Sequence, residues 1–277
     1  MRKQKTTSKW YSGLYIALVM VFLYAPILVL IAYSFNRSKS RSGWAGFSLH
    51  WYRELIHNSS ILSALFVTLL VAVVSAVLAT LIGTLAAIGI RAMRRRSQTA
   101  VMNFTYIPVV SPEIVMGVSL MLLFVLMKVE SGMVTLIIAH ITFNLPYVIL
   151  SVMPKLRQMD RYLFDAAMDL GCTPAMAFRK VMLPEIMPGI VTGFLMALTF
   201  SLDDFNVSYF VSGDKYQTLP ILIYSMTRRR VSPEINALST MIFVVVLAAL
   251  VIWNVLQIRK ERQLRLEQSA AVKEGMR

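Results

Sequence analysis

The sequence predicts an all-α, polytopic membrane protein with six transmembrane helices, and three observations support this fold class. Hydrophobic residues make up 57% of the 277-residue chain, and the mean hydropathy is +0.65, well above that of an ordinary soluble domain. Four long segments contain no charged side chain, and two more contain only one or two. Each reaches the roughly 20 residues that a membrane-spanning helix needs. A water-soluble fold does not account for six such segments, because its helices must show a polar face.

The expected membrane spans follow from these segments, and they are 12–33, 61–86, 101–127, 133–153, 189–211 and 236–257. The first span follows several basic residues, as a signal peptide would, but its apolar stretch exceeds the roughly 7–15 residues of such a peptide. We therefore expect it to remain as an anchor. The second span is longer than a bilayer requires, so it is expected to tilt or to project.

The distribution of basic residues predicts the orientation of the chain. A net charge of +14 would suggest a nucleic-acid partner in a soluble protein, but here the basic residues lie mainly in loops, so no such partner is expected. With the N-terminus inside, the cytoplasmic segments hold 19 of the 28 Lys and Arg residues. This bias places both termini in the cytoplasm. The predicted organisation is a cytoplasmic N-terminus at 1–11, a transmembrane domain at 12–257 and a cytoplasmic tail at 258–277.

Two outer loops contain apolar or aromatic residues that suit the membrane interface. Loop 34–60 carries Trp44, Trp51 and Tyr52, and such rings are enriched at the level of the lipid headgroups. Loop 212–235 contains an apolar run from Leu219 to Tyr224 that is too short to cross a bilayer. We interpret this run as a re-entrant or interfacial turn.

The third span carries an acidic residue, Glu113, in the sequence Ser111-Pro112-Glu113. A carboxylate near the bilayer centre costs about 2.5–3.5 kcal/mol, so such groups usually face a cavity, a pore or a partner. One interpretation is a pore-lining carboxylate. The other is local, with Ser111 as N-cap, Pro112 at the first helical position and Glu113 in a first turn that favours negative charge. Pro108 and Pro112 also indicate a broken helix.

The fourth span places His140 and Asn144 on one helix face, four residues apart. A metal site would need more ligands nearby. Hydrogen bonding between helices is the preferred interpretation.

The cytoplasmic loop 154–188 predicts two helices joined by a tight turn. Gly171 follows a run of helix formers and fits the left-handed position just beyond a helix end. Thr173 suits an N-cap and Pro174 the first position of a new helix. That second helix is expected to stop before Pro184, because proline disfavours a helical residue ahead of it.

The first of these two helices offers a surface for close contact. Ala166 and Ala167 would let another surface approach, and Leu163, Phe164 and Leu170 would add apolar contact. Two interpretations stay open at this point: a helical hairpin packed under the bundle, and a docking site for a soluble partner.

The fifth span carries two consecutive carboxylates, Asp203 and Asp204. Adjacent side chains on a helix diverge by about 100°, so we expect one to line a substrate path while neighbours hold the other. The neighbours considered are Ser201, Asn206 and Ser208. The alternative is a buried hydrogen-bonded pair, or an ion pair with a basic residue of a partner subunit.

The cytoplasmic loop resembles the signature loop of ABC importer permeases, in which Glu-Ala-Ala is followed at fixed spacing by Gly, an aliphatic residue and Leu-Pro. The matching residues are Asp165, Ala166, Ala167, Gly171, Val181, Leu183 and Pro184. The spacing matches throughout, and Asp165 replaces the usual Glu with a side chain shorter by one methylene. The resemblance implies the type I ABC importer permease fold. It also implies that this loop is the coupling helix, which sits in a cleft of the ATP-binding subunit.

Four shorter motifs, at 111–116, 140–143, 201–204 and 231–238, are similar to those of the second permease subunit of spermidine/putrescine importers. The resemblance implies ATP-driven polyamine import by alternating access. The implied partners are a second permease subunit, two ATP-binding cassette subunits, an extracytoplasmic polyamine-binding protein and membrane lipid.

A polyamine carries an ammonium group every few carbons, so spaced carboxylates and aromatic faces are suitable hosts for it. The residues assigned to the substrate path are therefore Glu113, Asp203, Asp204, Phe200 and Tyr209. Aromatic residues in an apolar run are more often packing residues, and Phe205 is included only as a neighbour of the Asp pair.

Two other function classes compete with an importer permease. An ion-coupled secondary transporter would use the same carboxylates without ATPase partners, but the two halves of the chain show no evident inverted repeat. A membrane enzyme would need a nucleophile–base pair or a metal constellation, and no such motif is found. The chain also has no phosphate-binding Gly-rich loop. No cofactor is expected, and ATP hydrolysis is assigned to partner subunits.

Overall fold

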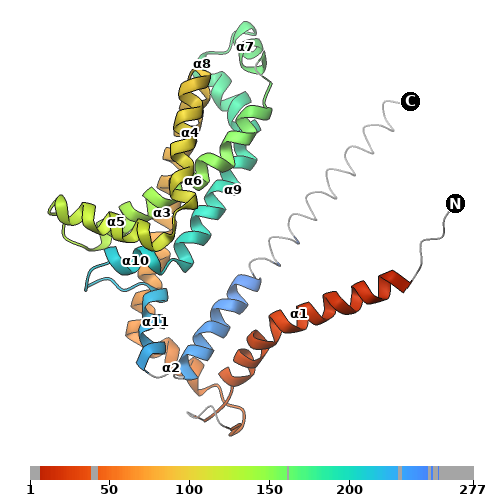
Figure 1. Cartoon of the computed structure of the whole chain (residues 1–277), viewed down its shortest axis with the longest axis vertical. Helices are drawn as coiled ribbons and strands as arrows, with labels where there is room; N and C mark the ends of the chain where they lie inside the picture. Colours follow the sequence, from red (N-terminus) through yellow and green to blue (C-terminus); the bar gives the residue numbers. More distant parts are fainter. Residues whose placement is uncertain are drawn as a thin grey trace. The chain divides into compact units, whose positions relative to one another are not determined.

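The computed structural model describes residues 7–38, 43–160, 162–229 and 233–248, together with Val251 and Val255 (Figure 1). The chain divides into two compact units. One contains the residues up to Asn58 and those from Met226 onward, and the other is Ser59–Ser225. Within the described residues the regular elements are helices, and Asn36 and Phe47 form one isolated antiparallel bridge.

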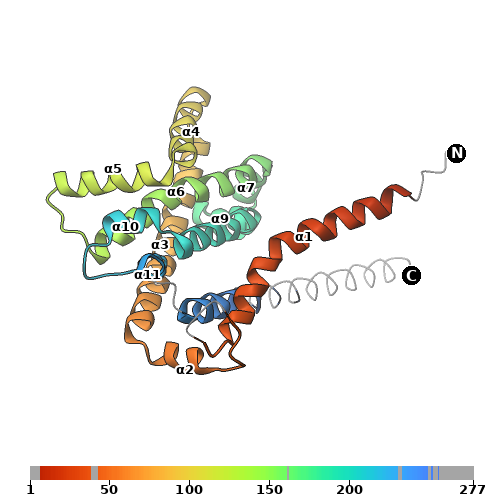
Figure 2. The ribbon, with the colours of Figure 1, turned by 60° about the horizontal axis from the view of Figure 1, so that its bottom comes forward.

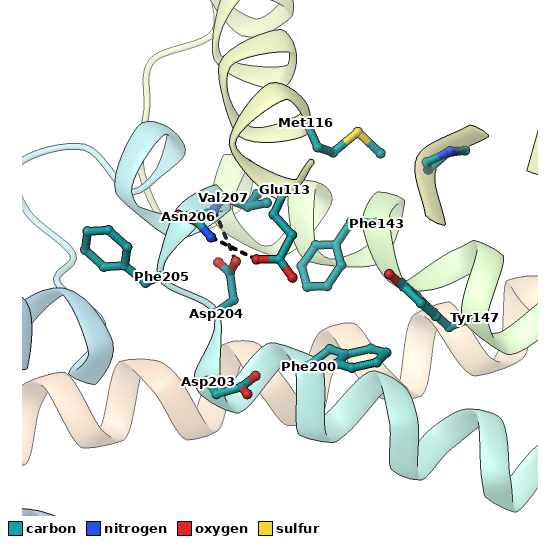
Figure 3. A pocket seen from close by; sticks show the side chains of 11 residues that line it. Glu113, Met116, Phe143, Tyr147, Phe200, Asp203, Asp204, Phe205, Asn206 and Val207 are labelled. Carbon is teal, nitrogen blue, oxygen red and sulfur yellow. Dashed lines mark hydrogen bonds between the residues drawn. The ribbon is translucent and has the colours of Figure 1, made fainter. Parts of the chain in front are cut away.

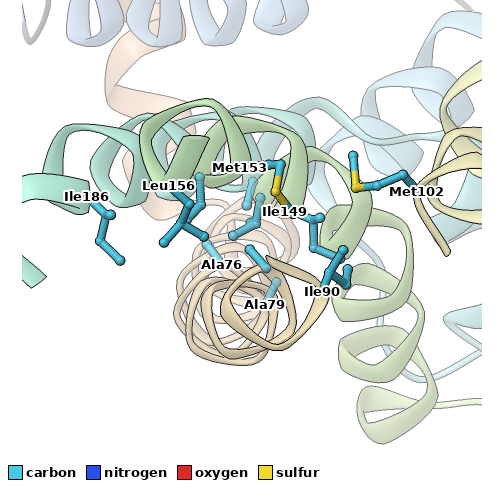
Figure 4. Close-up of a cluster of buried hydrophobic side chains, with 12 residues drawn as sticks. Ala76, Ala79, Ile90, Met102, Ile149, Met153, Leu156 and Ile186 are labelled. Atoms are coloured by element: carbon cyan, nitrogen blue, oxygen red, sulfur yellow. The ribbon is translucent and has the colours of Figure 1, made fainter. Parts of the chain in front are cut away.

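Three long helices form the centre of the unit Ser59–Ser225. These are α3 (Ser59–Ala92), α6 (Met133–Gln158) and α9 (Leu183–Asp203), which pack against one another (Figures 1 and 2). Their shared core combines small residues of α3 with larger aliphatic residues of α6 and α9 (Figure 4). Small residues suit this position because apolar lipid supplies little force to drive helices together, so close packing must do so.

Glycines bring the three helices into close contact around Val148 of α6. A Cβ atom built on Gly83 of α3 would lie 2.7 Å from Val148 Cγ1, and one built on Gly193 of α9 would lie 3.2 Å from Val148 Cα. Val148 itself is fully buried. The glycines therefore hold α6 between α3 and α9 with no space for an added methyl group.

Gly83→Ala is expected to destabilise this core by about 1–3 kcal/mol, the usual range for an overpacked interior. The matched control is Gly89→Ala on the same helix, because Gly89 is exposed and a Cβ there meets nothing within 4 Å. Thermal unfolding of the purified protein in detergent measures both variants. Equal melting temperatures for the two would contradict the packing assigned to Gly83.

Four described helical segments are long and apolar enough to cross a membrane, and they are Gly13–Ser34, Ser59–Ala92, Met133–Gln158 and Pro174–Asp203. The helices α4 (Arg95–Val110) and α5 (Glu113–Leu126) are apolar enough to count as a fifth span only when they are taken together, and they bend by 105° at their junction. The 34-residue α3 agrees with the prediction that the second span exceeds the bilayer. The sixth expected span overlaps the apolar helix Pro233–Ala248. Most of its remainder and the tail 258–277 lie outside the described residues.

The third expected span, 101–127, is therefore two helices with a sharp bend, and the Ser-Pro sequence at 111–112 explains the break. Ser111 adopts extended backbone angles (φ −76°, ψ 142°), as the residue before a proline prefers. The predicted N-cap was wrong by one residue, because Pro112 occupies that position and Glu113 begins α5. The Ser111 hydroxyl instead donates a hydrogen bond to the carbonyl of Ile107, at 2.8 Å.

The fifth expected span, 189–211, was wrong at both ends. Its helix begins at Pro174 as α8 (Pro174–Ala177), passes through the π-helical segment η1 (Phe178–Met182) and continues as α9. It does not stop before Pro184. The Leu183 N–H donates a hydrogen bond to the carbonyl of Phe178, five residues earlier. This wider turn accommodates the ring of Pro184, which has no N–H to donate.

The same span also ends earlier than expected. The chain leaves the helix at Asp204, which has extended backbone angles (φ −63°, ψ 119°), and the short helix α10 (Asn206–Val211) follows. The apolar run at 219–224 was expected to be a turn, but it forms the first half of α11 (Leu219–Arg229). The Leu219 N–H donates to Thr68 Oγ1 at 2.7 Å, which joins the start of α11 to α3.

The other unit contains α1 (Thr7–Ser34), a loop and α2 (His50–His57). Trp51 of α2 is buried, and its indole N–H donates to the carbonyl of Asn36 at 2.8 Å. The Tyr52 hydroxyl lies 2.6 Å from that of Ser34. Trp44 is 57% exposed, so among the three predicted interfacial rings it alone is largely free to meet lipid headgroups.

Candidate functional site

Two helix breaks meet at one cavity of the unit Ser59–Ser225. The first is the bend between α4 and α5, and the second is the interruption between α9 and α10. Between them lies a cavity of about 220 Å³ that also borders α6. The cavity is lined by Pro108, Glu113, Met116, Phe143, Tyr147, Phe200, Asp203, Asp204, Phe205, Asn206 and Val207 (Figure 3). The lining therefore contains three carboxylates and four aromatic rings, and it contains no basic residue.

Glu113 connects the two breaks. It is the first residue of α5, its side chain is exposed to the cavity, and its Oε2 accepts a hydrogen bond from Asn206 Nδ2 at 2.8 Å (Figure 3). Gly117, one turn further along α5, lies so close to α10 that an added Cβ would stand 3.0 Å from the carbonyl oxygen of Asn206. The start of α5 and the start of α10 are thus joined by both a polar and a packing contact.

Asp203 and Asp204 have different surroundings. Asp203 is the last residue of α9 and is exposed at the cavity. Asp204 is 8% exposed. Its Oδ1 accepts from the Val207 N–H at 3.1 Å, and its Oδ2 accepts from the N–H and hydroxyl of Ser208, both at 2.7 Å. Asp204 therefore caps the N-terminus of α10. The angle of about 100° expected between the two adjacent side chains does not apply, because Asp204 lies beyond the end of α9.

A buried polar network supports this cap from α6. His140 Nε2 lies 3.0 Å from Ser208 Oγ and 3.5 Å from Asp204 Oδ2. One turn along α6, Asn144 Nδ2 donates to Ser201 Oγ of α9 at 2.8 Å. The predicted interhelical hydrogen bonding of His140 and Asn144 is confirmed. The network extends to Ser75 of α3, which lies 3.1 Å from Ser201.

The aromatic walls come partly from residues that the sequence did not single out. Phe200 lines the cavity, and its ring centroid lies 4.6 Å from that of Tyr147. Tyr147 and Phe143 belong to α6 and also line the cavity. Their spacing of four residues, beside His140 and Asn144, is the signal that places them on a shared helix side.

Tyr209 does not line this cavity. It belongs to α10, is 51% exposed, and packs with its ring centroid 5.4 Å from that of Phe205. It borders a separate cavity of about 570 Å³ together with Asp214 and Tyr216. Within the described residues, no group of three or more His, Cys, Asp or Glu side chains is placed to hold a metal ion.

The first part of the signature loop, up to Pro174, folds as its sequence predicts. Helix α7 (Tyr162–Asp169) is followed by the turn residue Gly171, whose φ is +86°. The Gly171 N–H donates to Met168 O at 2.9 Å and the Cys172 N–H to Ala167 O at 3.1 Å, the paired pattern of a Schellman motif. Thr173 then caps α8 by accepting from the Met176 N–H at 3.4 Å. Arg161 lies outside the described residues.

Helix α7 presents an apolar outer surface. Tyr162 and Leu170 are 77% and 87% exposed, and Asp165 and Ala166 are also exposed, whereas Ala167 is buried. The half-buried Leu183 and the exposed Pro184 lie where η1 joins α9, and α7 packs against η1. Exposed apolar side chains on a short helix at the end of a bundle are typical of a contact surface.

Comparisons with known proteins identify the family. The model of the binding-protein-dependent transport system inner membrane component family matches residues 79–265. The spermidine/putrescine transport system permease protein PotC of Haemophilus influenzae is 40% identical over 234 residues, which cover 84% of this chain and 91% of PotC. The putrescine transport system permease protein PotI of Escherichia coli K12 is 42% identical over 250 residues, which cover 87% of this chain and 89% of PotI.

Solved structures agree on the fold. A chain of a bacterial ABC transporter for import of the acidic polysaccharide alginate aligns with a TM-score of 0.67 at 15% identity, covering 88% of this chain and 92% of its own. A chain of the MetNI methionine ABC transporter aligns with a TM-score of 0.55 at 20% identity, and the alignment covers 71% of this chain and 94% of that chain. The expected type I ABC importer permease fold is therefore confirmed. The chain is a multi-pass membrane protein that belongs to the family of binding-protein-dependent transport system inner membrane components.

Proposed function

We propose that this chain is a transmembrane permease subunit of an ATP-driven ABC importer that carries polyamines such as spermidine and putrescine into the cytoplasm. The observation that carries the proposal is the acidic, aromatic cavity between the two helix breaks. The names of the relatives PotC and PotI support the same substrate class.

The lining of the cavity favours a cation over an anion or a neutral solute. Three carboxylates and no basic residue line it, and a negative surface in a low-dielectric setting attracts positive charge. The same fold serves alginate import in another transporter, so fold alone does not select the substrate. The side chains of the cavity make that selection.

The residues assigned to the substrate path have different roles in this proposal. Glu113 and Asp203 pair with ammonium groups of the substrate, and Phe200 offers a ring face for a cation–π contact. Asp204 holds the start of α10 in place. Tyr209 contacts the substrate outside the main cavity, beside Phe205.

The signature loop is proposed to connect this site to ATP hydrolysis. Asp165, Ala166 and Ala167 of α7 would sit in a cleft of the ATP-binding subunit, with Gly171 setting the turn behind them. Leu183 and Pro184 would pass the movement into α9. Because α9 ends at Asp203, a displacement of α7 reaches the cavity through one helical element and shifts the protein between two packed states.

The proposed assembly contains this chain, a second permease subunit, two ATP-binding cassette subunits and an extracytoplasmic polyamine-binding protein. Both termini lie in the cytoplasm, as the excess of basic residues on that side indicates. ATP hydrolysis takes place on the partner subunits.

The test is ATP-dependent uptake of labelled spermidine and putrescine by vesicles that contain this chain and its genomic neighbours. Glu113→Gln and Asp203→Asn are each expected to lower uptake about 10-fold or more, the effect of losing one hydrogen bond to a charged group. Glu130→Gln is the matched control, because Glu130 is exposed and does not line the cavity. Uptake that persists without an ATPase subunit would instead establish a secondary transporter.

A further inference from the structure

A further cavity of about 490 Å³ lies where α3 and α6 end and α4 begins. Arg91 near the end of α3, Arg95 at the start of α4 and Arg157 near the end of α6 line it. Gln98 and Asn103 add amide groups, and no acidic residue belongs to the lining. Among the described residues, none of the three arginines forms an ion pair with a carboxylate. Three arginines around one cavity repel each other unless an anion joins them.

An apolar cavity adjoins this basic one. It has a volume of about 280 Å³ and is lined by Leu150, Met153 and Pro154 of α6, among others. Met102, Tyr106 and Arg157 line both cavities. The two cavities are therefore neighbours between α4 and α6, and one is basic while the other is mainly apolar.

Helix α4 buries little of its surface against the rest of the unit. Met102 is the one buried residue of α4, while Phe104, Ile107 and Val110 are exposed. The N-terminus of α4 carries no side-chain cap and lies at the basic cavity. A helix start adds partial positive charge and free N–H donors to whatever anion binds there.

We propose that the two cavities together bind an anionic phospholipid from the leaflet at this end of the helices. Arg95 and Arg157 pair with the phosphate, and an acyl chain lies along the apolar cavity between α4 and α6. Basic pockets between transmembrane helices suit anionic headgroups. A soluble phosphate would satisfy the arginines equally well, but it would leave the adjoining apolar cavity unfilled, and this difference favours a lipid. The proposal goes beyond the transport of the substrate and does not depend on which solute is carried.

The experiment measures phospholipid binding by the intact transporter complex, purified in a neutral detergent and titrated with phosphatidylglycerol or with phosphatidylcholine. Native mass spectrometry counts the bound lipids. The test variant is Arg95→Gln with Arg157→Gln. Arg91 is left unchanged because it also borders a cavity beneath α7 that contains Asp165. The matched control is Arg94→Gln with Arg96→Gln, which removes the same charge from exposed residues that line neither cavity.

The wild type and the control are expected to bind phosphatidylglycerol in preference to phosphatidylcholine. The test variant should bind phosphatidylglycerol about 25-fold more weakly, since each basic residue near an anionic membrane contributes roughly fivefold. Inorganic phosphate is added in a separate arm. Displacement of the lipid by millimolar phosphate would overturn the lipid assignment in favour of a free anion site. Equal binding of both lipids would contradict the selection of an anionic headgroup. Equal affinity of the test variant and the control would show that Arg95 and Arg157 do not hold the lipid, and it would also overturn the proposal.

Discussion

Asp204→Ala is expected to destabilise the protein by about 3 kcal/mol or more and to reduce the amount of folded transporter in the membrane. Three hydrogen bonds end on this buried carboxylate, and bonds to a charged acceptor contribute about 1.5–3 kcal/mol each. Hydrogen bonds between membrane helices average only about 0.6 kcal/mol. These three, however, form a local cap within five residues, and alanine would leave the backbone N–H groups of Val207 and Ser208 buried without this acceptor.

The conservative variant Asp204→Asn removes the negative charge but keeps a side chain that can still cap α10. Asp204→Asn keeps an acceptor oxygen at the position of either Oδ1 or Oδ2. With the side chain in its present position it accepts from either Val207 or Ser208, and we expect about half of the loss seen with alanine. Thermal unfolding of the purified complex, with the yield of monodisperse protein, measures both variants.

The adjacent residue is the matched control for this prediction. Asp203→Asn changes an exposed side chain at the end of α9, so stability should change by less than about 0.5 kcal/mol while uptake falls. The reverse result, with Asp204→Ala stable but inactive, would transfer the substrate-contacting role to Asp204.

Gly171→Val is expected to reduce ATP-driven uptake to the background of vesicles that lack the ATPase subunit. Gly171 has a φ of +86°, and an L-residue in the left-handed region costs roughly 1–2 kcal/mol. An added Cβ meets nothing within 4 Å, so the strain acts on the turn and not on packing. Opening this turn changes the angle between α7 and α8, and with it the surface proposed to meet the ATPase.

Gly171→Asn is the control, because asparagine tolerates the left-handed region better than other residues with a side chain. It should retain most of the uptake and the bound ATPase subunit. Both variants should melt near the wild-type temperature, since the change is confined to an exposed turn. Wild-type uptake by Gly171→Val would refute the coupling role assigned to this loop.

The signature loop was predictable from sequence because its structure is local. A helix end, a left-handed glycine and a following cap are decided by residues within about five positions of one another. Gly171, Thr173 and Pro174 accordingly occupy the positions that the sequence assigned to them. Pro184 is the exception in the same segment. Its place inside a continuous helix depends on the wider π-turn at Phe178–Met182, which no composition rule indicates.

The membrane location of the chain was also determined by sequence alone, since burial in lipid requires long runs without charge. What those runs do not encode is which side of each helix meets protein and which meets lipid. In a soluble protein the polar face reveals the buried one. In a membrane both faces are apolar, so the pattern that predicts the spans cannot orient them.

The tertiary structure therefore decided the site. It placed Phe143 and Tyr147 beside Asp203, moved Tyr209 to a neighbouring cavity and separated the roles of two consecutive aspartates. Each outcome depends on contacts between helices distant in sequence, such as the bond from Asn206 of α10 to Glu113 of α5. Hydropathy determines that these helices lie in the membrane, and only the packing of one helix on another determines where their polar groups meet.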